Sequence, residues 1–317
     1  MARTDYLDRR HTLQLIAAAI ALPVLRVVPV SAAHADVLEV APGVFVHRGR
    51  HELISAANSG DIANPGFVIG RDAVAVIDTG GSPVVGDSLK TAIVAITDRP
   101  IRYVINTHMH PDHVFGNAAF DTPDVTFVGH HKLARGLTAR AERYLAINGE
   151  LLGPAALAGT RIITPSLEVA DRTVIDLGGR TLELVARPTA HTDNDLTIKD
   201  SETGTLFMGD LIFSGHVPTI DGSIRGWIKL LDTIAAEAPV RVVPGHGPHA
   251  LAWEQAERPM RRYLETVAGD VRDMIRKGLS LSEALETAGL SEKDNWVLFD
   301  DYHRRNVSAA YAELEWE

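Results

Sequence analysis

The chain has 317 residues, of which 45% are hydrophobic, enough for a sizeable core in one large domain or two small ones. The formal net charge is −10, and no run of lysine and arginine forms a basic stripe, which argues against nucleic-acid binding. Cysteine is absent, which excludes disulfides, thiolate metal ligands and a cysteine nucleophile. Any metal must therefore be held by histidine and carboxylate, a donor set that suits zinc, iron or manganese.

The first 35 residues have the pattern of an export signal. Arg9-Arg10 precede an apolar run at 13–22, and Ala33-His34-Ala35 forms a small-x-small cleavage site. The paired arginines resemble a twin-arginine signal. A single membrane anchor is the alternative, but two prolines and an arginine within 23–29 interrupt the roughly 20 apolar residues that a span needs. The sequence therefore predicts a cleaved signal peptide over 1–35 and a periplasmic protein without a membrane span in the mature chain.

The remainder of the chain alternates strands and helices in two similar halves. In the first half, period-2 patterns and turn signals predict strands at 37–40, 44–48, 66–70, 73–78, 101–106 and 125–128, with helices at 85–98 and 132–148. In the second half they predict strands at 173–177, 181–186, 196–200, 205–208 and 240–243, a helix at 226–236 and a helical tail from 251. This order predicts an α+β protein in which two sheets pack face to face with helices outside.

The most informative stretch is 107–113, where four potential metal ligands occur within six residues: His108, His110, Asp112 and His113. It follows the predicted strand at 101–106, and Pro111 suits the first turn of a helix. In extended chain, side chains two residues apart share a face, so the first two histidines point the same way. The other two ligands reach a second point nearby. This geometry favours two metal ions over one.

Three further strand ends carry ligand-type residues beside glycine or alanine, as expected where the backbone approaches a crowded site. These residues are His191, Asp210 and His246. Together, His-x-His-x-Asp-His, a lone His, Gly-Asp and Gly-His-Gly, in this order, resemble the metallo-β-lactamase superfamily over essentially all of 37–250. The resemblance implies a four-layer αβ/βα sandwich with the metal site at one edge. We expect this domain to span 36–250 and a helical extension, 251–317, to pack on it.

The resemblance also implies a role for each ligand by its position. His108, His110 and His191 would bind the first metal. Asp112, His113 and His246 would bind the second, and Asp210 would bridge the two. Asp112 would also orient the attacking water, which makes it the candidate catalytic residue.

Several other residues are candidates for supporting roles. The resemblance makes Asp78, at the end of a predicted strand, a residue that fixes the metal loop, although a turn-forming aspartate is an equal alternative. Asp193 could accept a hydrogen bond beside the lone histidine. His216 could contact substrate or donate a proton, or could be a surface-loop histidine. Arg225 and Trp227 could line the mouth. Specificity in such folds depends on loops over the site, here 51–64, 149–165 and 214–226.

The predicted centre has a chemistry of its own. Two zinc ions, two aspartates and a bridging hydroxide leave a formal charge near +1, and a metal lowers the pKa of its bound water to about 7. The sequence therefore predicts an exported dinuclear-zinc hydrolase in which a metal-bound hydroxide attacks an ester, lactam, thioester or related bond of a small-molecule substrate.

Within the superfamily, residues 106–117 and 192–195 look most like exported zinc metallohydrolases associated with sulfur oxidation or with quinoprotein (PQQ) dehydrogenase systems. Two alternatives remain open. One is an iron-dependent persulfide oxygenase of the same fold. The other is a metal-binding accessory protein of a quinoprotein system.

Overall fold

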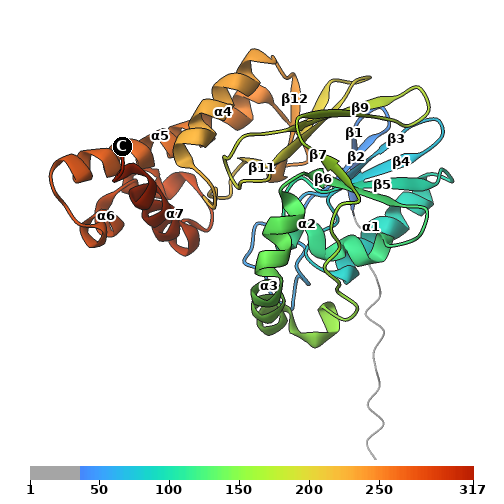
Figure 1. Cartoon of the computed structure of the whole chain (residues 1–317), viewed down its shortest axis with the longest axis horizontal. Coiled ribbons are helices and arrows are strands. Elements are labelled where there is room, and N and C mark those ends of the chain that lie inside the picture. The colour runs from blue at the N-terminus through green and yellow to red at the C-terminus, as the bar shows by residue number, and fades with distance from the viewer. Residues whose placement is uncertain (1–35) are drawn as a thin grey trace, which may run out of the picture. The chain divides into compact units, whose positions relative to one another are not determined.

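Two β-sheets packed face to face form the centre of the described part of the chain (Figure 1). The computed structural model describes residues 36–317, so the predicted signal peptide lies outside the described residues. The first sheet has seven strands in sequence order, antiparallel from β1 to β4 and parallel from β4 to β7. Its strands are β1 (Val37–Ala41), β2 (Val44–His47), β3 (Gly66–Ile69), β4 (Val74–Ile77), β5 (Ile101–Ile105), β6 (Thr126–His130) and β7 (Leu167–Val169).

The second sheet has six strands in the order β13-β12-β11-β10-β9-β8, and β11 with β12 is its parallel pair. These strands are β8 (Arg172–Asp176), β9 (Thr181–Ala186), β10 (Leu196–Asp200), β11 (Thr205–Phe213), β12 (Arg241–His246) and β13 (Leu251–Ala252). The hairpins predicted around Pro42-Gly43 and Arg71-Asp72 are present as β1–β2 and β3–β4.

The strand β4 shows how the layers are arranged. Ala75 and Ile77 belong to the core between the two sheets, whereas Val74 and Val76 belong to the core beneath helix α1 (Pro83–Ile96). Alternate side chains of a strand point to opposite faces, so this continuous apolar run lies between two hydrophobic layers. Helices α4 (Ile224–Ala236) and α5 (Trp253–Arg276) cover the second sheet. The predicted four-layer αβ/βα sandwich is confirmed.

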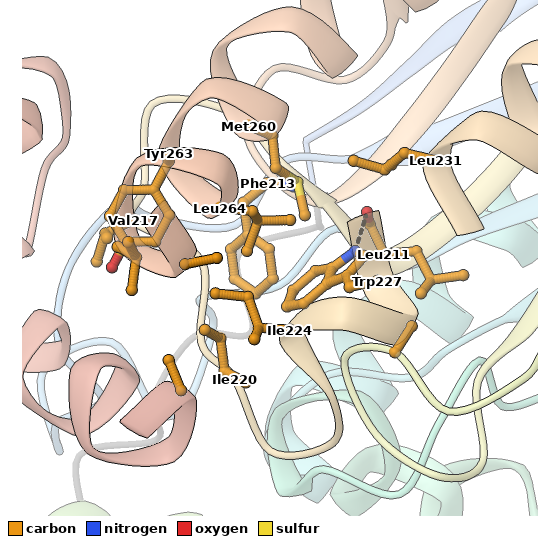
Figure 2. Close-up of a cluster of buried hydrophobic side chains, with 14 of the residues drawn as sticks. Leu211, Phe213, Val217, Ile220, Ile224, Trp227, Leu231, Met260, Tyr263 and Leu264 are labelled. Carbon is orange, nitrogen blue, oxygen red and sulfur yellow. Dashed lines mark hydrogen bonds between the residues drawn. The ribbon is translucent and has the colours of Figure 1, made fainter. Parts of the chain in front are cut away.

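The core beneath α4 contains a tryptophan that the sequence analysis misplaced (Figure 2). Trp227 is completely buried, packs near Phe213 and donates its indole N–H to the carbonyl of Leu211 at 3.1 Å. Ser223 caps α4 by accepting from an amide of its first turn, and Trp227 is the fourth residue of the helix. The prediction that Trp227 and Arg225 line the mouth is wrong, because Trp227 is buried in this core and Arg225, which pairs with Glu317 at 2.8 Å, does not line the cavity described below.

The tail predicted to be helical from 251 begins with the strand β13, and after it the chain is helical through α5, α6 (Leu281–Thr287), the 3₁₀ helix η2 (Leu290–Asn295) and α7 (Phe299–Leu314). Ser280 and Glu283 form a capping box at the start of α6. The described residues belong to one compact unit. Within residues 36–317 we find no helix with the length and apolar character of a bilayer span.

Three strands and one helix differ from the prediction. The helix α3 (Leu133–Ala156) continues into the segment 149–165 that was expected to be a loop. The strands β7 and β13 are only three and two residues long, too short to produce a clear alternation. The strand β11 continues to Phe213 instead of ending at Met208. Its register shifts around Gly209, so Asp210 lies in an irregular part of the strand and not beyond its end.

Candidate metal centre

The stretch 107–113 comprises the loop after β5 and the start of the short helix α2 (Pro111–Val114), with Pro111 in the first turn as predicted. Two asparagines fix this loop. Asn106 and Asn117 exchange reciprocal amide hydrogen bonds of 3.1 and 2.8 Å, and the hydroxyl of Thr79 donates to Asn117 at 2.9 Å. Helix α3 (Leu133–Ala156) packs on the loop from outside. The loop is therefore held from both sides before any ligand binds.

Three imidazoles and one carboxylate converge at the first cluster. The Nδ1 atom of His110 lies 3.2 Å from Nε2 of His108 and 3.0 Å from Nε2 of His191. Oδ2 of Asp210 lies 3.7 Å from the first of these Nε2 atoms and 3.4 Å from the second. All four donor atoms lie within 4.8 Å of one another.

The outer nitrogens of these rings show that the inner ones carry lone pairs. Nδ1 of His191 is 2.7 Å from the carbonyl of Thr219, which can only accept, so this nitrogen bears the proton. Nε2 of His110 lies 2.9 Å from the Asp221 carboxylate and is a donor for the same reason. In neutral imidazoles the remaining nitrogens, which face each other at the centre, are lone pairs. Lone pairs facing each other at 3 Å repel, and a cation between them removes the repulsion.

The contacts of Asp78 identify the protonated ring nitrogen of two further ligands, His108 and His113. Its carboxylate accepts from the amide and the hydroxyl of Thr107 at 2.8 and 2.7 Å and from Nδ1 of His113 at 2.8 Å. Because the Thr107 hydroxyl donates to Asp78, its lone pair accepts from Nδ1 of His108 at 3.0 Å. Asp78 has a left-handed φ of 56°, which is uncommon for a residue with a side chain and typical of functional sites. It holds the loop in the way that the resemblance implied.

The second cluster consists of Asp112, His113 and His246, whose donor atoms also lie within 4.8 Å of one another. Nδ1 of His246 donates to the carbonyl of Ile62 at 2.8 Å, so its Nε2 is the inner nitrogen. That Nε2 lies 3.2 Å from Oδ2 of Asp112. Oδ1 of Asp210 lies 3.0 Å from Nε2 of His113 and 3.4 Å from Nε2 of His246.

Asp210 therefore points one oxygen at each cluster. The neighbouring strand makes room for this: a Cβ on Gly245 would lie 2.0 Å from Oδ1 of Asp210. Gly209, with φ of 50°, allows equally close approach to Thr107, because a Cβ there would lie 2.5 Å from Oγ1. The small residues predicted beside the ligands are thus required by the packing of the centre.

The pKa values of the two clusters move in opposite directions. Burial holds the pKa of His108 well below its usual range and lowers that of His191 to about 3. Burial also opposes charge on His113 and His246, but the nearby carboxylates, Asp210 first, raise the pKa of His246 to about 9 and that of His113 well above its usual value. Without a cation the second cluster holds protons where a metal would bind, so metal binding must displace them.

A divalent cation fits these residues. Nε2 of His113 and Oδ1 of Asp210 are buried and have no hydrogen-bond partner among residues 36–317, although buried polar atoms are normally satisfied. The donors are imidazole nitrogen and carboxylate oxygen, which suit zinc, iron and manganese. The described clusters together contain all seven predicted ligands: His108, His110, Asp112, His113, His191, Asp210 and His246.

Asp221 is a supporting residue that no sequence motif indicates, and it holds His110 from the loop before α4. Its carboxylate also pairs with Arg140 and lies 3.5 Å from Arg305, and its pKa is held far below the ordinary value of an aspartate despite burial. The sequence Asp221-Gly222 indicates only a turn. Nothing local connects it to a histidine 111 residues earlier.

Of two further candidates, Asp193 and His216, only His216 lies at the metal centre. Asp193 accepts from Arg135 at 2.7 Å and from Asn194 at 2.8 Å, so the structure does not bring it to His191. His216 is buried beside the second cluster, with its ring centroid 5.0 Å from that of His246. Burial lowers its pKa to about 4, so the imidazole is neutral near pH 7. It can contact substrate, but it is not an imidazolium that could act as a general acid.

A cavity of about 600 Å³ opens onto both clusters. All three segments expected to form specificity loops contribute residues to it, among them Ile54, Leu151 and Thr219, but Leu151 lies on helix α3, which occupies 149–156 of the segment predicted as a loop. Helix α7 adds Tyr302 and Arg305, which places the C-terminal extension at the site. The cavity is therefore bounded by the sandwich on one side and by the helical tail on another.

A two-sheet sandwich with two His/Asp clusters at the ends of its strands is a metal-dependent hydrolase. The sequence profile of the Metallo-beta-lactamase superfamily matches residues 59–246, and the chain belongs to this superfamily.

Relatives in this superfamily include two enzymes whose names state an activity. The chain is 28% identical to bovine Acyl-coenzyme A thioesterase MBLAC2 over 59% of its own length and 74% of the relative's. It is 21% identical to the Linear primary-alkylsulfatase of a Pseudomonas strain over 69% of its length. It is also 26% identical to the Beta-lactamase-like protein 2 homolog of Caenorhabditis elegans. The chain spans about half the length of the nematode protein (55%) and of the alkylsulfatase (48%).

Solved structures share the fold. A metallo-beta-lactamase from Pontibacter korlensis aligns with a TM-score of 0.57 and 20% identity over 73% of this chain and 98% of that one. The inverting sec-alkylsulfatase Pisa1 from Pseudomonas sp. aligns with a TM-score of 0.66 and 15% identity, over 87% of this chain and 50% of its own. An overlap of 87% has to include part of the helical tail, whereas the overlap of 73% with the lactamase does not require it.

Proposed function

We propose that this chain is a dinuclear zinc hydrolase that cleaves an ester, lactam, thioester or related bond. The observation that carries the proposal is the pair of facing clusters with Asp210 directing one oxygen into each. Among these bonds, thioesters and sulfate esters are the first substrates to test, because two relatives are named as a thioesterase and an alkylsulfatase.

In the proposed hydrolysis, the bound cation and the side chains of the protein have different roles. A divalent cation bound here supplies Lewis-acid polarisation and makes water more acidic. Asp112 is the candidate ligand most open to the cavity, with 17% of its side chain exposed against 1% for His113 and 4% for His246. Its carboxylate can accept the proton of the attacking water. The new bond joins the water oxygen to the acyl carbon or sulfur, the bond to the leaving group breaks, and the proton passes to that group.

Tyr302 supports this chemistry from α7. Its side chain lines the cavity, and burial together with the charge of Asp112 raises its pKa to about 12. The phenol therefore stays protonated near pH 7. It can donate a hydrogen bond to the oxygen on which negative charge develops.

Metal content tests the proposal directly. Protein purified without added metal and analysed by elemental mass spectrometry should contain about two zinc ions per chain. The variant His246→Ala should retain about one, because it loses a donor of the second cluster only. About one iron in the unsubstituted protein would overturn the proposal in favour of the persulfide oxygenase, which oxygen consumption with a persulfide would then detect. Intact zinc without hydrolysis of any ester, thioester or sulfate ester would favour the accessory role.

Export and the association with sulfur oxidation or quinoprotein systems are further parts of this proposal. They are supported by the pattern of residues 1–35 and by the resemblance of 106–117. Mass analysis of the protein from the periplasmic fraction should give a chain that begins at Asp36. A chain that retains residues 1–35 in the membrane fraction would contradict a cleaved signal.

A further inference from the structure

One face of α3 lines the cavity from end to end. The residues on this face are Arg140, Arg143, Tyr144, Ile147, Asn148 and Leu151. Their spacing of three and four residues is that of a single helix face. At a rise of about 1.5 Å per residue, the face is roughly 16 Å long.

The polarity of this face changes along its length. Arg140 marks the end near the metal centre, because it pairs with Asp221, which holds His110. At the far end, Ile147 and Leu151 are 42% and 44% exposed although they are large aliphatic side chains. Apolar surface left exposed beside a functional cavity usually marks a place where a ligand binds.

The polar end carries three arginines, one of which has no carboxylate partner in the described part of the chain. Arg140 and Arg305 share the carboxylate of Asp221, and no carboxylate within residues 36–317 pairs with Arg143. The two other aspartates that line the cavity, Asp112 and Asp210, belong to the metal clusters, where a bound cation offsets their charge. Among the described residues, Arg143 is therefore an unpaired positive charge beside the cavity, which attracts an anion.

We propose that the site takes a single-chain anionic amphiphile. Its anionic head lies beside Arg143 and Arg305 at the metal centre, and its aliphatic chain runs along α3 over Ile147 and Leu151. Ile54 lines the same cavity and adds apolar surface to it. The assignment of the head as the group that is cleaved rests on the proposed hydrolase function, whereas the binding of the amphiphile does not.

Alkyl sulfonates test the proposal, because their C–S bond is not an ester and binding can be measured without turnover. Isothermal titration of butane-, hexane-, octane- and decanesulfonate should give Kd values that fall by up to about fourfold per buried methylene. A decyltrimethylammonium ion should bind at least tenfold more weakly than decanesulfonate. Equal affinity for the two decyl ions, or no dependence on chain length, would overturn the proposal.

Substitutions on α3 and α7 assign the two ends. Ile147→Ser and Leu151→Ser should flatten the dependence on chain length and leave butanesulfonate binding unchanged. Arg143→Gln and Arg305→Gln should weaken every sulfonate by about threefold to tenfold and leave neutral decyl glucoside unchanged. The control is Leu145→Ser, a partly exposed leucine of the same helix that does not line the cavity. An effect of Leu145→Ser equal to that of Ile147→Ser would overturn the assignment.

Titrations of both zinc-loaded and chelated protein separate this proposal from the hydrolase. Chain-length and arginine dependence in both forms, without turnover of any ester, would uphold the amphiphile site and contradict the hydrolase. Hydrolysis of esters with no such dependence would uphold the hydrolase and overturn the amphiphile site.

Discussion

His110 and Asp221 are 111 residues apart in the chain, and Nε2 of the imidazole lies 2.9 Å from Oδ2 of the carboxylate. The contact fixes the ring so that Nδ1 faces the other two histidines of the first cluster. It also joins the metal loop to the loop before α4. Since Asp221 pairs with Arg140 and lies near Arg305, one carboxylate connects the ligand set to the cationic end of the cavity.

The substitution Asp221→Asn should weaken zinc binding at the first cluster about tenfold to hundredfold. Asparagine can still accept from His110, but it lacks the charge that makes the imidazole a stronger ligand and that offsets the two arginines. Competition with a chromogenic chelator measures the affinity. Asp193→Asn is the matched control, because Asp193 contacts Arg135 and Asn194 and no ligand. An equal loss of affinity in both variants would show that His110 does not depend on Asp221.

Gly245→Ala should remove zinc from the protein. The new Cβ would meet Oδ1 of Asp210 at 2.0 Å, and the carboxylate that faces both clusters would have to move. We expect a zinc content below one per chain and a loss of about 1–3 kcal/mol in the free energy of unfolding, typical of overpacking. Gly269→Ala on α5 is the control, because no atom lies within 4 Å of its Cβ position. Full zinc content in Gly245→Ala would contradict the bridging role of Asp210.

The ligand set could be predicted because it is written in short local motifs at strand ends. The loop at 107–113 carries four ligands on its own, and small residues mark the other three positions. Asp210 was nevertheless placed beyond a strand end, because a bulge that lengthens β11 has no period-2 signal. The ligands therefore come together as predicted, but the backbone that carries Asp210 is an irregular strand and not the loop expected after Met208.

What could not be predicted depends on contacts between distant segments. Asp221 and Trp227 lie six residues apart, yet Asp221, on the loop before α4, supports a ligand, whereas Trp227, on the packed face of α4, fills the core. Tyr302 and Arg305 reach the cavity only because the helical tail packs beside it. Periodicity indicates that a helix has an apolar face, but it does not say which element that face meets.

Tyr302→Phe should lower kcat/KM by about tenfold to hundredfold without changing zinc content, because one hydrogen bond to a charged oxygen is worth about 1.5–3 kcal/mol. The hydroxyl has no hydrogen-bond partner within residues 36–317, while the ring lies 5.4 Å from that of His216 and is kept by phenylalanine. Steady-state kinetics with a p-nitrophenyl ester or an acyl thioester gives the ratio. Tyr311→Phe on the same helix is the control, because its hydroxyl bonds the carbonyl of Leu279. Unchanged kcat/KM in Tyr302→Phe would exclude the hydroxyl from the reaction.

His130→Asn should make the chelated protein less sensitive to acid. Burial lowers the pKa of His130 to about 4, whereas the unfolded chain titrates near 6.5, so the unfolded state binds more protons between these values. The contribution is present above pH 6.5 and is lost as the pH falls toward 4. Between pH 7.5 and pH 5 the loss amounts to about 2 kcal/mol.

Urea unfolding at these two pH values should therefore show a larger decrease for the unsubstituted protein than for His130→Asn. Asparagine keeps an acceptor for the amide of Lys132, which bonds Nδ1 of His130 at 3.0 Å, so the fold is retained. The control is His131→Asn, at the exposed histidine that stacks on His130. Chelation keeps metal release out of the comparison, since losing the cation at low pH would destabilise every variant. An identical decrease in all three proteins would mean that His130 is not the buried neutral group responsible.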